Sequence, residues 1–178
     1  MRLIASAINS VTPSPTKPWN SRIVLGCWAA KYLPLCSHYL PGFPITYIGF
    51  SIIYVHHFFA VPNISFNFLQ PILMTPFGRS LISKAHSQRP ARPVFAWTAN
   101  DETRMRYDIE QGVDVVITDD PKLFLEISEG WADGKKSTWG ISVWLDVVWI
   151  NILGIVYGYL FQRRFGDKKV IRKWWGKQ

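Results

Sequence analysis

The amino-acid sequence predicts an α/β fold in which parallel strands alternate with helices, as they do in a β/α barrel. Its short apolar runs, such as "RIVLGCW" at residues 22–28 and "VDVVIT" at 113–118, are of the unalternating kind expected of strands buried on both faces. Helix-sized segments separate the runs, which is typical of parallel β/α units. The last two runs end in polar residues, and active sites of barrels form at the carboxyl ends of the strands. We therefore expect a functional site at those ends.

The first element is expected to be a short amphipathic helix over residues 1–11. Ile4, Ala7 and Ile8 repeat there at helical spacing. A secretory signal peptide is not expected, because the apolar core is too short and polar residues interrupt it. Residues 12–18 contain three prolines, which exclude regular structure and predict a connector.

Four or five strands follow, with helices between them. The strands are expected at residues 22–28, 45–54, 64–67, 93–98 and 113–118. The helices are expected at residues 29–39, in one or two short pieces within 68–86, between 100 and 112, and from 121 onwards. Asn100 is predicted to cap the helix that Gly112 ends as the C′ residue. Asp120 is predicted to cap the last helix, with Pro121 at its first position.

The net charge of +8 does not indicate a nucleic-acid-binding protein. Residues 162–178 hold seven Lys or Arg against one acidic residue, so this tail carries +6 and the rest of the chain only +2. A protein that tracks a phosphate backbone has a basic stripe or helix in its fold. Cys27 and Cys36 are too few for a disulfide framework and lack zinc-site spacing, so free thiols in a reducing compartment are expected.

Residues 139–161 form an apolar segment long enough to cross a bilayer, with aromatic rings that suit its interfaces. Asp146 and Asn151 would be costly near the centre of a lone span. A hairpin bent at Gly154 and Gly158, or a segment lying in the interface, is therefore expected rather than a single span. The chain then divides into an α/β region at 1–130, a linker at 131–138, a membrane segment at 139–161 and a basic tail at 162–178.

The two polar strand ends resemble the C-terminal end of the glycerophosphodiester phosphodiesterase family. That family has a strand ending in Trp-Thr-Val-Asn, then a helix, then Gly-Val-Asp-Gly-Ile-Ile-Thr-Asp. Residues 97–100 here read Trp-Thr-Ala-Asn, and residues 112–119 read Gly-Val-Asp-Val-Val-Ile-Thr-Asp, so Ala99 and Val115 depart from the pattern. The resemblance covers roughly residues 1–130 and implies the last part of a TIM-type β/α barrel. "RIVLGCW…LPLC" and the apolar tail look closest to the fungal branch of phosphatidylglycerol-directed phospholipases C.

The resemblance implies a phosphoric diester hydrolase of glycerophospholipid metabolism, yet the family's catalytic segments are absent. Its His-Arg-Gly, Glu-x-Asp, His-Asp and Glu-x-Lys segments lie in the first half of the barrel, and none occurs here. A full barrel takes about 250 residues. We therefore expect no catalytic residue and no metal ligand in this chain, and Mg²⁺ or Ca²⁺ only in a completed domain. The chain is predicted to be inactive alone, as a truncated gene product, a degenerate copy or part of a split enzyme.

Histidines offer no substitute for the missing segments. His56 and His57 follow a predicted strand without a nearby carboxylate, so they are expected to be structural rather than a catalytic pair. His38 and His86 are not followed by Arg-Gly or Asp either.

Four residues are expected to rim the site at the strand ends without catalysing: Trp28, Trp97, Asn100 and Asp119. Trp97 suits stacking on the glycerol or lipid part of a substrate, and suits filling the barrel as well. Asp119 is expected to fix a loop, because its neighbour caps a helix.

The expected partners are an anionic membrane surface, met by the basic tail, and a second copy or a complementing half-barrel. A glycerophospholipid is the expected substrate once the barrel is complete. The expected location is the cytosolic face of an intracellular membrane. The alternative is a non-catalytic, membrane-associated remnant or interaction protein, and a third hypothesis needs only residues 139–178 as a membrane-surface module.

Overall fold

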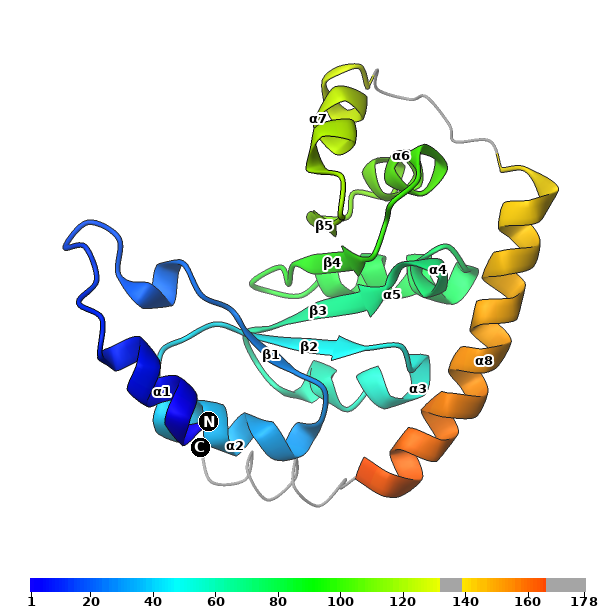
Figure 1. Cartoon of the computed structure of the whole chain (residues 1–178). Helices are drawn as coiled ribbons and strands as arrows, with labels where there is room; N and C mark the ends of the chain where they lie inside the picture. The colour runs from blue at the N-terminus through cyan, green and yellow to red at the C-terminus, as the bar shows by residue number, and fades with distance from the viewer. Residues whose placement is uncertain (132–138, 166–178) are drawn as a thin grey trace.

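A computed structural model describes residues 1–131 and 139–165 of the chain. Its centre is one sheet of parallel strands in chain order, with β1 and β5 at the edges (Figure 1). The strands are β1 (Leu25–Cys27), β2 (Ile45–Gly49), β3 (Ile64–Leu69), β4 (Val94–Trp97) and β5 (Val115–Ile117). This confirms the predicted α/β fold, and consecutive parallel neighbours are what part of a TIM-type barrel requires.

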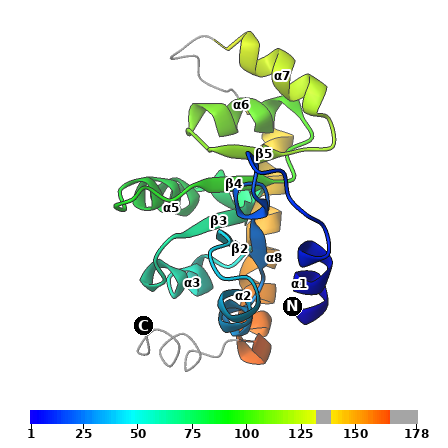
Figure 2. The same cartoon turned by 90° about the vertical axis from the view of Figure 1, so that its left-hand side faces the viewer.

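The helices are α1 (Arg2–Asn9), α2 (Leu33–Tyr39), α3 (Ile52–Val55), α4 (Gln70–Leu73), α5 (Pro76–His86), α6 (Glu102–Glu110), α7 (Pro121–Glu129) and α8 (Ile141–Phe165), with short 3-10 turns η1 (Trp19–Ser21), η2 (Ala30–Tyr32) and η3 (Phe58–Ala60). Helices α2 to α6 lie in the crossovers between successive strands, whereas α1 precedes β1 and α7 and α8 follow β5. Figure 2 looks along the strands and shows α3 and α5 on one side of the sheet, with α8 at its far end. Most of the predicted linker, and the tail beyond residue 165, lie outside the described residues.

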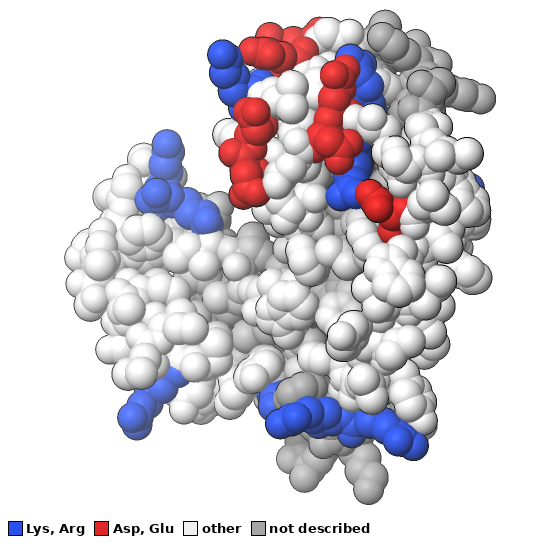
Figure 3. Space-filling view, turned by 45° about the vertical axis from the view of Figure 1, so that its right-hand side comes forward, with Lys and Arg blue, Asp and Glu red and all other residues white. Residues whose placement is uncertain are grey.

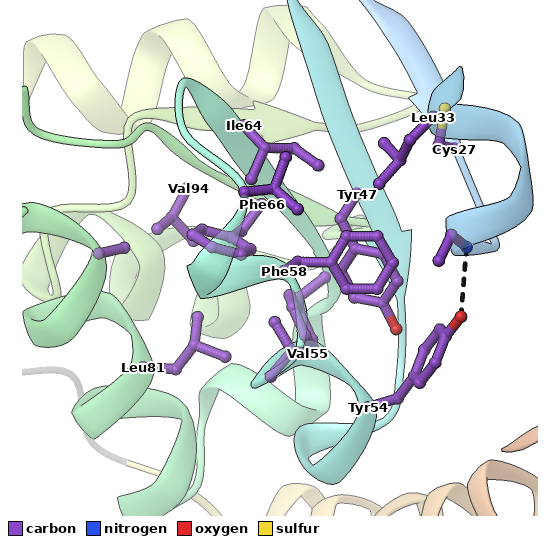
Figure 4. Close-up of a cluster of buried hydrophobic side chains, with 14 of the residues drawn as sticks. Cys27, Leu33, Tyr47, Tyr54, Val55, Phe58, Ile64, Phe66, Leu81 and Val94 are labelled. Carbon is purple, nitrogen blue, oxygen red and sulfur yellow. Dashed lines mark hydrogen bonds between the residues drawn. The ribbon is translucent and has the colours of Figure 1, made fainter. Parts of the chain in front are cut away.

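One face of the sheet carries Tyr47 and Phe66 and is called the convex face. An aromatic layer buries it against the crossover helices (Figure 4). Tyr47 of β2 stacks on Phe58, with ring centroids 4.0 Å apart, and lies edge-on to Phe68 of β3. Burial raises the pKa of the Tyr47 hydroxyl. The Tyr54 hydroxyl accepts a hydrogen bond from the Ala30 amide at 3.2 Å, which ties the start of the first crossover to the second.

Two predicted boundaries in the middle of the chain were wrong. The second strand ends at Gly49 rather than continuing to residue 54. Ser51 accepts a hydrogen bond from the Tyr54 amide at its side chain and so starts α3. The third strand runs to Leu69, beyond the predicted residue 67. An unalternating apolar run fits a buried strand or a buried helix, so periodicity could not place these ends.

Two local predictions near the ends of helices also needed correction. The N-terminal helix forms as predicted, but it packs through Met1, Ala5 and Ile8, while Ile4 is 52% exposed. The N-cap of α6 is Asp101, whose side chain accepts from the Arg104 amide at 3.0 Å, and not Asn100. The Asn100 side chain instead bonds that of Asp119.

The start of α5 packs so closely on α4 that residue 78 has to be glycine. A Cβ at Gly78 would overlap backbone atoms of Ile72 and Leu73, which cannot move aside as a side chain can. Gly130, by contrast, has its nearest potential Cβ neighbour at 3.4 Å, the Glu126 carbonyl oxygen.

We predict that Gly78→Ala lowers the free energy of unfolding by about 1–3 kcal/mol, because overpacking forces a backbone shift. The matched control Gly130→Ala should change it by less than about 0.5 kcal/mol. Urea denaturation of the full chain in mild detergent measures both. Equal stability of the two variants would contradict the close α4–α5 packing.

Candidate site at the strand ends

The concave face of the sheet carries polar residues that the sequence analysis did not single out. Side chains alternate between the faces of a strand, so neighbours of the convex aromatic residues point to the concave side. Thr46, Ser65 and Asn67 lie there, all less than 9% exposed. The polar residues at alternate positions of "ISFNF", and the single Thr46 within "ITYIG", were the signal that could have found them.

Trp28 and Trp97 show how far the sheet curves. Trp28 follows β1 and Trp97 ends β4, with two strands between them in the sheet, yet their rings meet edge to face with centroids 5.7 Å apart. Strands spaced about 4.8 Å apart in a flat sheet would hold these positions about three spacings apart. Barrel-like curvature therefore brings both predicted rim tryptophans together over the concave face. Trp28 remains 42% exposed.

Asn100 and Asp119 also meet, in the loops after β4 and β5. The Asn100 side-chain amide donates to Asp119 Oδ2 at 2.6 Å. The Asn100 Oδ1 atom accepts from the Asp119 amide at 2.9 Å and from the Thr118 hydroxyl at 3.2 Å. These bonds bind the two loops to each other, so Asp119 fixes a loop here. Asp120 caps α7 through the Leu123 amide at 3.0 Å, as predicted.

Several concave-face polar atoms have no hydrogen-bond partner among the described residues. They are Thr46 Oγ1, Asn67 Oδ1 and Trp97 Nε1. Leaving such groups buried and unpaired costs about 1–3 kcal/mol each. The concave face therefore offers one N–H donor, one carbonyl acceptor and one hydroxyl. A substrate, water or additional strands could form hydrogen bonds with them.

The histidines lie away from this arrangement. His86 Nε2 is 2.9 Å from Asp114 Oδ2, which also accepts from the Val94 amide at 2.7 Å. Both carboxylate contacts are at the amino ends of β4 and β5, the edge opposite the rim, where barrel residues serve stability. His56 and His57 lie in the crossover after α3. In residues 1–131 and 139–165 no three His, Cys, Asp or Glu side chains gather to hold a metal ion.

A buried polar pair lies behind the site, between α4 and α6. Gln70 donates from Nε2 to Asp108 Oδ1 at 3.2 Å, and both side chains are fully buried. Burial raises the pKa of Asp108 to about 7, against a smaller lowering by the Gln70 hydrogen bond. Gln70 Oε1 and Asp108 Oδ2 have no hydrogen-bond partner within the described part of the chain.

We predict that Asp108 makes stability depend on pH. The folded protein holds the proton up to about pH 7, whereas the unfolded chain releases it near pH 4, so stability should fall as pH rises through that window. Asp108→Asn should abolish this fall and stabilise the protein above pH 7 by about 1–3 kcal/mol. Urea denaturation at pH 5 and pH 8 measures the effect. The exposed Glu129→Gln variant is the control and should keep the wild-type difference; an unchanged pH dependence in Asp108→Asn would rule out the assignment.

Comparison with known proteins places the strands in a family. A family model described as "Glycerophosphoryl diester phosphodiesterase family" matches residues 2–123, more than half of the chain. The match runs from α1 into α7 and includes all five strands and the four rim residues, but not α8. No curated protein and no solved structure matches the chain.

Proposed function

The chain belongs to the glycerophosphoryl diester phosphodiesterase family, and from that premise we propose that it forms the carboxyl-terminal five strands of a phosphoric diester hydrolase barrel. In this proposal it supplies the rim that receives the substrate and lacks the groups that cleave it. The reaction is hydrolysis of a glycerophosphodiester or glycerophospholipid, and it requires the remaining strands.

One observation carries the proposal: the four rim residues converge at the carboxyl edge of a curved parallel sheet. Trp28 and Trp97 contact each other, and Asn100 is bonded to Asp119. The paired rings offer an apolar surface for the glycerol or acyl part of a substrate. The unpaired Asn67 and Trp97 groups offer polar contacts to its oxygens.

Acid–base and metal chemistry do not fit the described residues. Hydrolysis of a phosphodiester needs a proton for the leaving alkoxide and a cation against the developing charge. The family resemblance implies a divalent ion, Mg²⁺ or Ca²⁺, for the complete domain, yet no suitable cluster of ligands exists among the described side chains. Of the four rim residues Asp119 alone has a carboxylate, and it is already bonded to Asn100. We therefore assign no catalytic step to this chain.

Phosphatidylglycerol is the first lipid to test as substrate. The resemblance of "RIVLGCW…LPLC" to the phosphatidylglycerol-directed branch supports that choice. A lipid substrate also agrees with α8, since residues 141–161 are long and apolar enough to cross a membrane. A location on the cytosolic face of an intracellular membrane remains part of the proposal, with the basic tail on anionic headgroups.

A second candidate function is a non-catalytic, membrane-associated interaction protein descended from such an enzyme. The absence of a ligand cluster among the described side chains is compatible with it as much as with a partial enzyme. The membrane-surface module of residues 139–178 alone is less favoured, because α8 packs against the α/β region along its length. Restoration of activity by the missing strands distinguishes the first two.

We predict that the purified 178-residue chain does not hydrolyse glycerophosphocholine or phosphatidylglycerol with Mg²⁺, Ca²⁺ or Mn²⁺. Phosphate-ester release measured over a long incubation checks this. Metal-dependent turnover that the double variant His56→Ala, His57→Ala abolishes would overturn the prediction and make those histidines catalytic.

A complementation experiment tests the positive half of the proposal. A polypeptide with the first three strands of a complete family member should restore metal-dependent hydrolysis when it is mixed or co-expressed with this chain. Trp97→Ala should reduce the restored activity by about tenfold or more, because substrate stacking is lost. Leu125→Ala, an exposed change on α7, is the control. Failure of several such polypeptides to restore activity would favour the interaction protein.

A further inference from the structure

Helix α8 has two opposite apolar faces. It is one continuous helix from Ile141 to Phe165, so the structure has the helical form of the predicted membrane segment and not the hairpin. Val147 and Gly158 are buried, and the residues at matching helical spacing between and around them are half-buried. This docked face comprises Val143, Val147, Asn151, Gly154, Gly158 and Phe161.

The docked face packs on the carboxyl ends of β2 and β3. The Asn151 side-chain amide donates to the Pro71 carbonyl at 3.1 Å, and a Cβ at Gly158 would lie 3.1 Å from Ser51 Oγ. Ser51 follows β2 and Pro71 follows β3. The glycines therefore serve close approach to the α/β region, and neither bends the helix.

The outward face is apolar as well, which a water-facing helix would not tolerate. It repeats at three- and four-residue spacing and has no charged member; the exposed Asp146 lies beside it, with its carboxylate 4.0 Å from the Arg104 guanidinium. Its members are Ile141, Trp144, Leu145, Val148, Trp149, Ile152, Ile155, Val156, Tyr159 and Leu160, all exposed. Figure 3, with the right-hand side of Figure 1 turned forward, shows a broad uncharged surface between charged groups at its two ends.

We propose that α8 lies flat in the surface of an anionic bilayer, with its outward face in the lipid and its docked face holding the strand ends at the membrane. This inference deepens the membrane association proposed above and names its geometry. It does not depend on whether the chain takes part in hydrolysis.

The docking contacts favour a flat helix over a span. They run from Trp139, which meets Tyr107 with ring centroids 5.2 Å apart, to Phe161, which meets Phe50 at 6.1 Å. A span docked along this whole length would carry the loops after β2 and β3 into hydrocarbon, where irregular backbone exposed to lipid is not found. A flat helix keeps the α/β region in water.

The positions of the aromatic rings and charges agree with a helix that lies at headgroup level. Trp and Tyr prefer the headgroup level, which in a span means its two ends. Here Trp149 lies near the middle of the apolar segment and is 61% exposed. Arg163 and Arg164 are exposed at one end of α8, and the sequence beyond them adds further Lys and Arg. Each cation near an anionic surface adds attraction, which identifies the partner as a lipid surface rather than a second, equally basic copy.

Spin labels at three positions of the outward face measure the orientation. Leu145→Cys, Ile152→Cys and Tyr159→Cys share one face, seven residues apart, and span about 21 Å along the axis. Cys27 and Cys36 are buried, so the introduced thiol takes the label. On vesicles of phosphatidylcholine and phosphatidylglycerol in equal parts, the three labels should report the same shallow depth. A label at the exposed Ser83→Cys on α5 should stay in water.

A charge substitution tests whether the outward face enters the lipid. Ile152→Lys adds attraction to the anionic vesicles yet removes an exposed apolar side chain that would enter the lipid, so full-chain binding in a flotation assay should fall about tenfold. Ser83→Lys adds the same charge away from α8 and should not weaken binding. Near-ultraviolet circular dichroism checks that both variants keep the wild-type fold.

Three outcomes would overturn the proposal. The Ile152 label lying about 10 Å deeper than the other two would show a span. No binding to these vesicles, or binding unaffected by Ile152→Lys, would show that the outward face does not enter lipid. Spin–spin broadening between copies without vesicles would identify a second copy as the occupant. None of these results depends on hydrolysis, so the proposed function stands or fails separately.

Discussion

Burial of the convex face of the sheet under its crossover helices is the constraint on which the rest of the structure depends. A parallel sheet is stable only when its faces are covered, and here the cover is aromatic, with Tyr47 stacked on Phe58 at its centre. Because side chains alternate along a strand, placing Tyr47 and Phe66 on the convex side sends Thr46 and Asn67 to the other. The packing of the core thus decides which residues the concave face can offer.

The concave face is where the described sheet is left open. The curvature that brings Trp28 to Trp97 is that of a barrel, but β1 and β5 have no further strand beside them in the described structure. On β5, Val115 and Ile117 point to the concave side and are 38% and 40% exposed. The chemistry follows from the topology: a rim needs only the loops of a few strands, whereas a metal site draws carboxylates from several strands around a closed barrel.

Helix α8 connects the open strand ends to a second exposed apolar surface. It docks where the strands end, through Asn151 and the close approach at Gly158, and presents a second apolar face outwards. If α8 lies in a bilayer surface as proposed, this one helix sets both the distance between the rim and the membrane and the direction in which the rim opens. The raised pKa of Asp108 arises on the neighbouring α6, where close packing against α4 leaves a carboxyl group without water.

Much of this fold could be predicted from short sequence patterns alone. The strands, the helix cap at Asp120, the left-handed Gly112 and the polar strand ends were predicted because apolar runs and turn chemistry act over a few residues. Tertiary structure alone decided what depends on distant partners. Asn100 left its predicted cap to bond Asp119, α1 turned Ala5 rather than Ile4 inwards, and β2 gave way to α3 at Ser51. An apolar pattern shows that a residue is to be buried. Only the surface that buries it fixes which face turns inwards, where a strand stops, and which side of a long apolar helix packs against the fold.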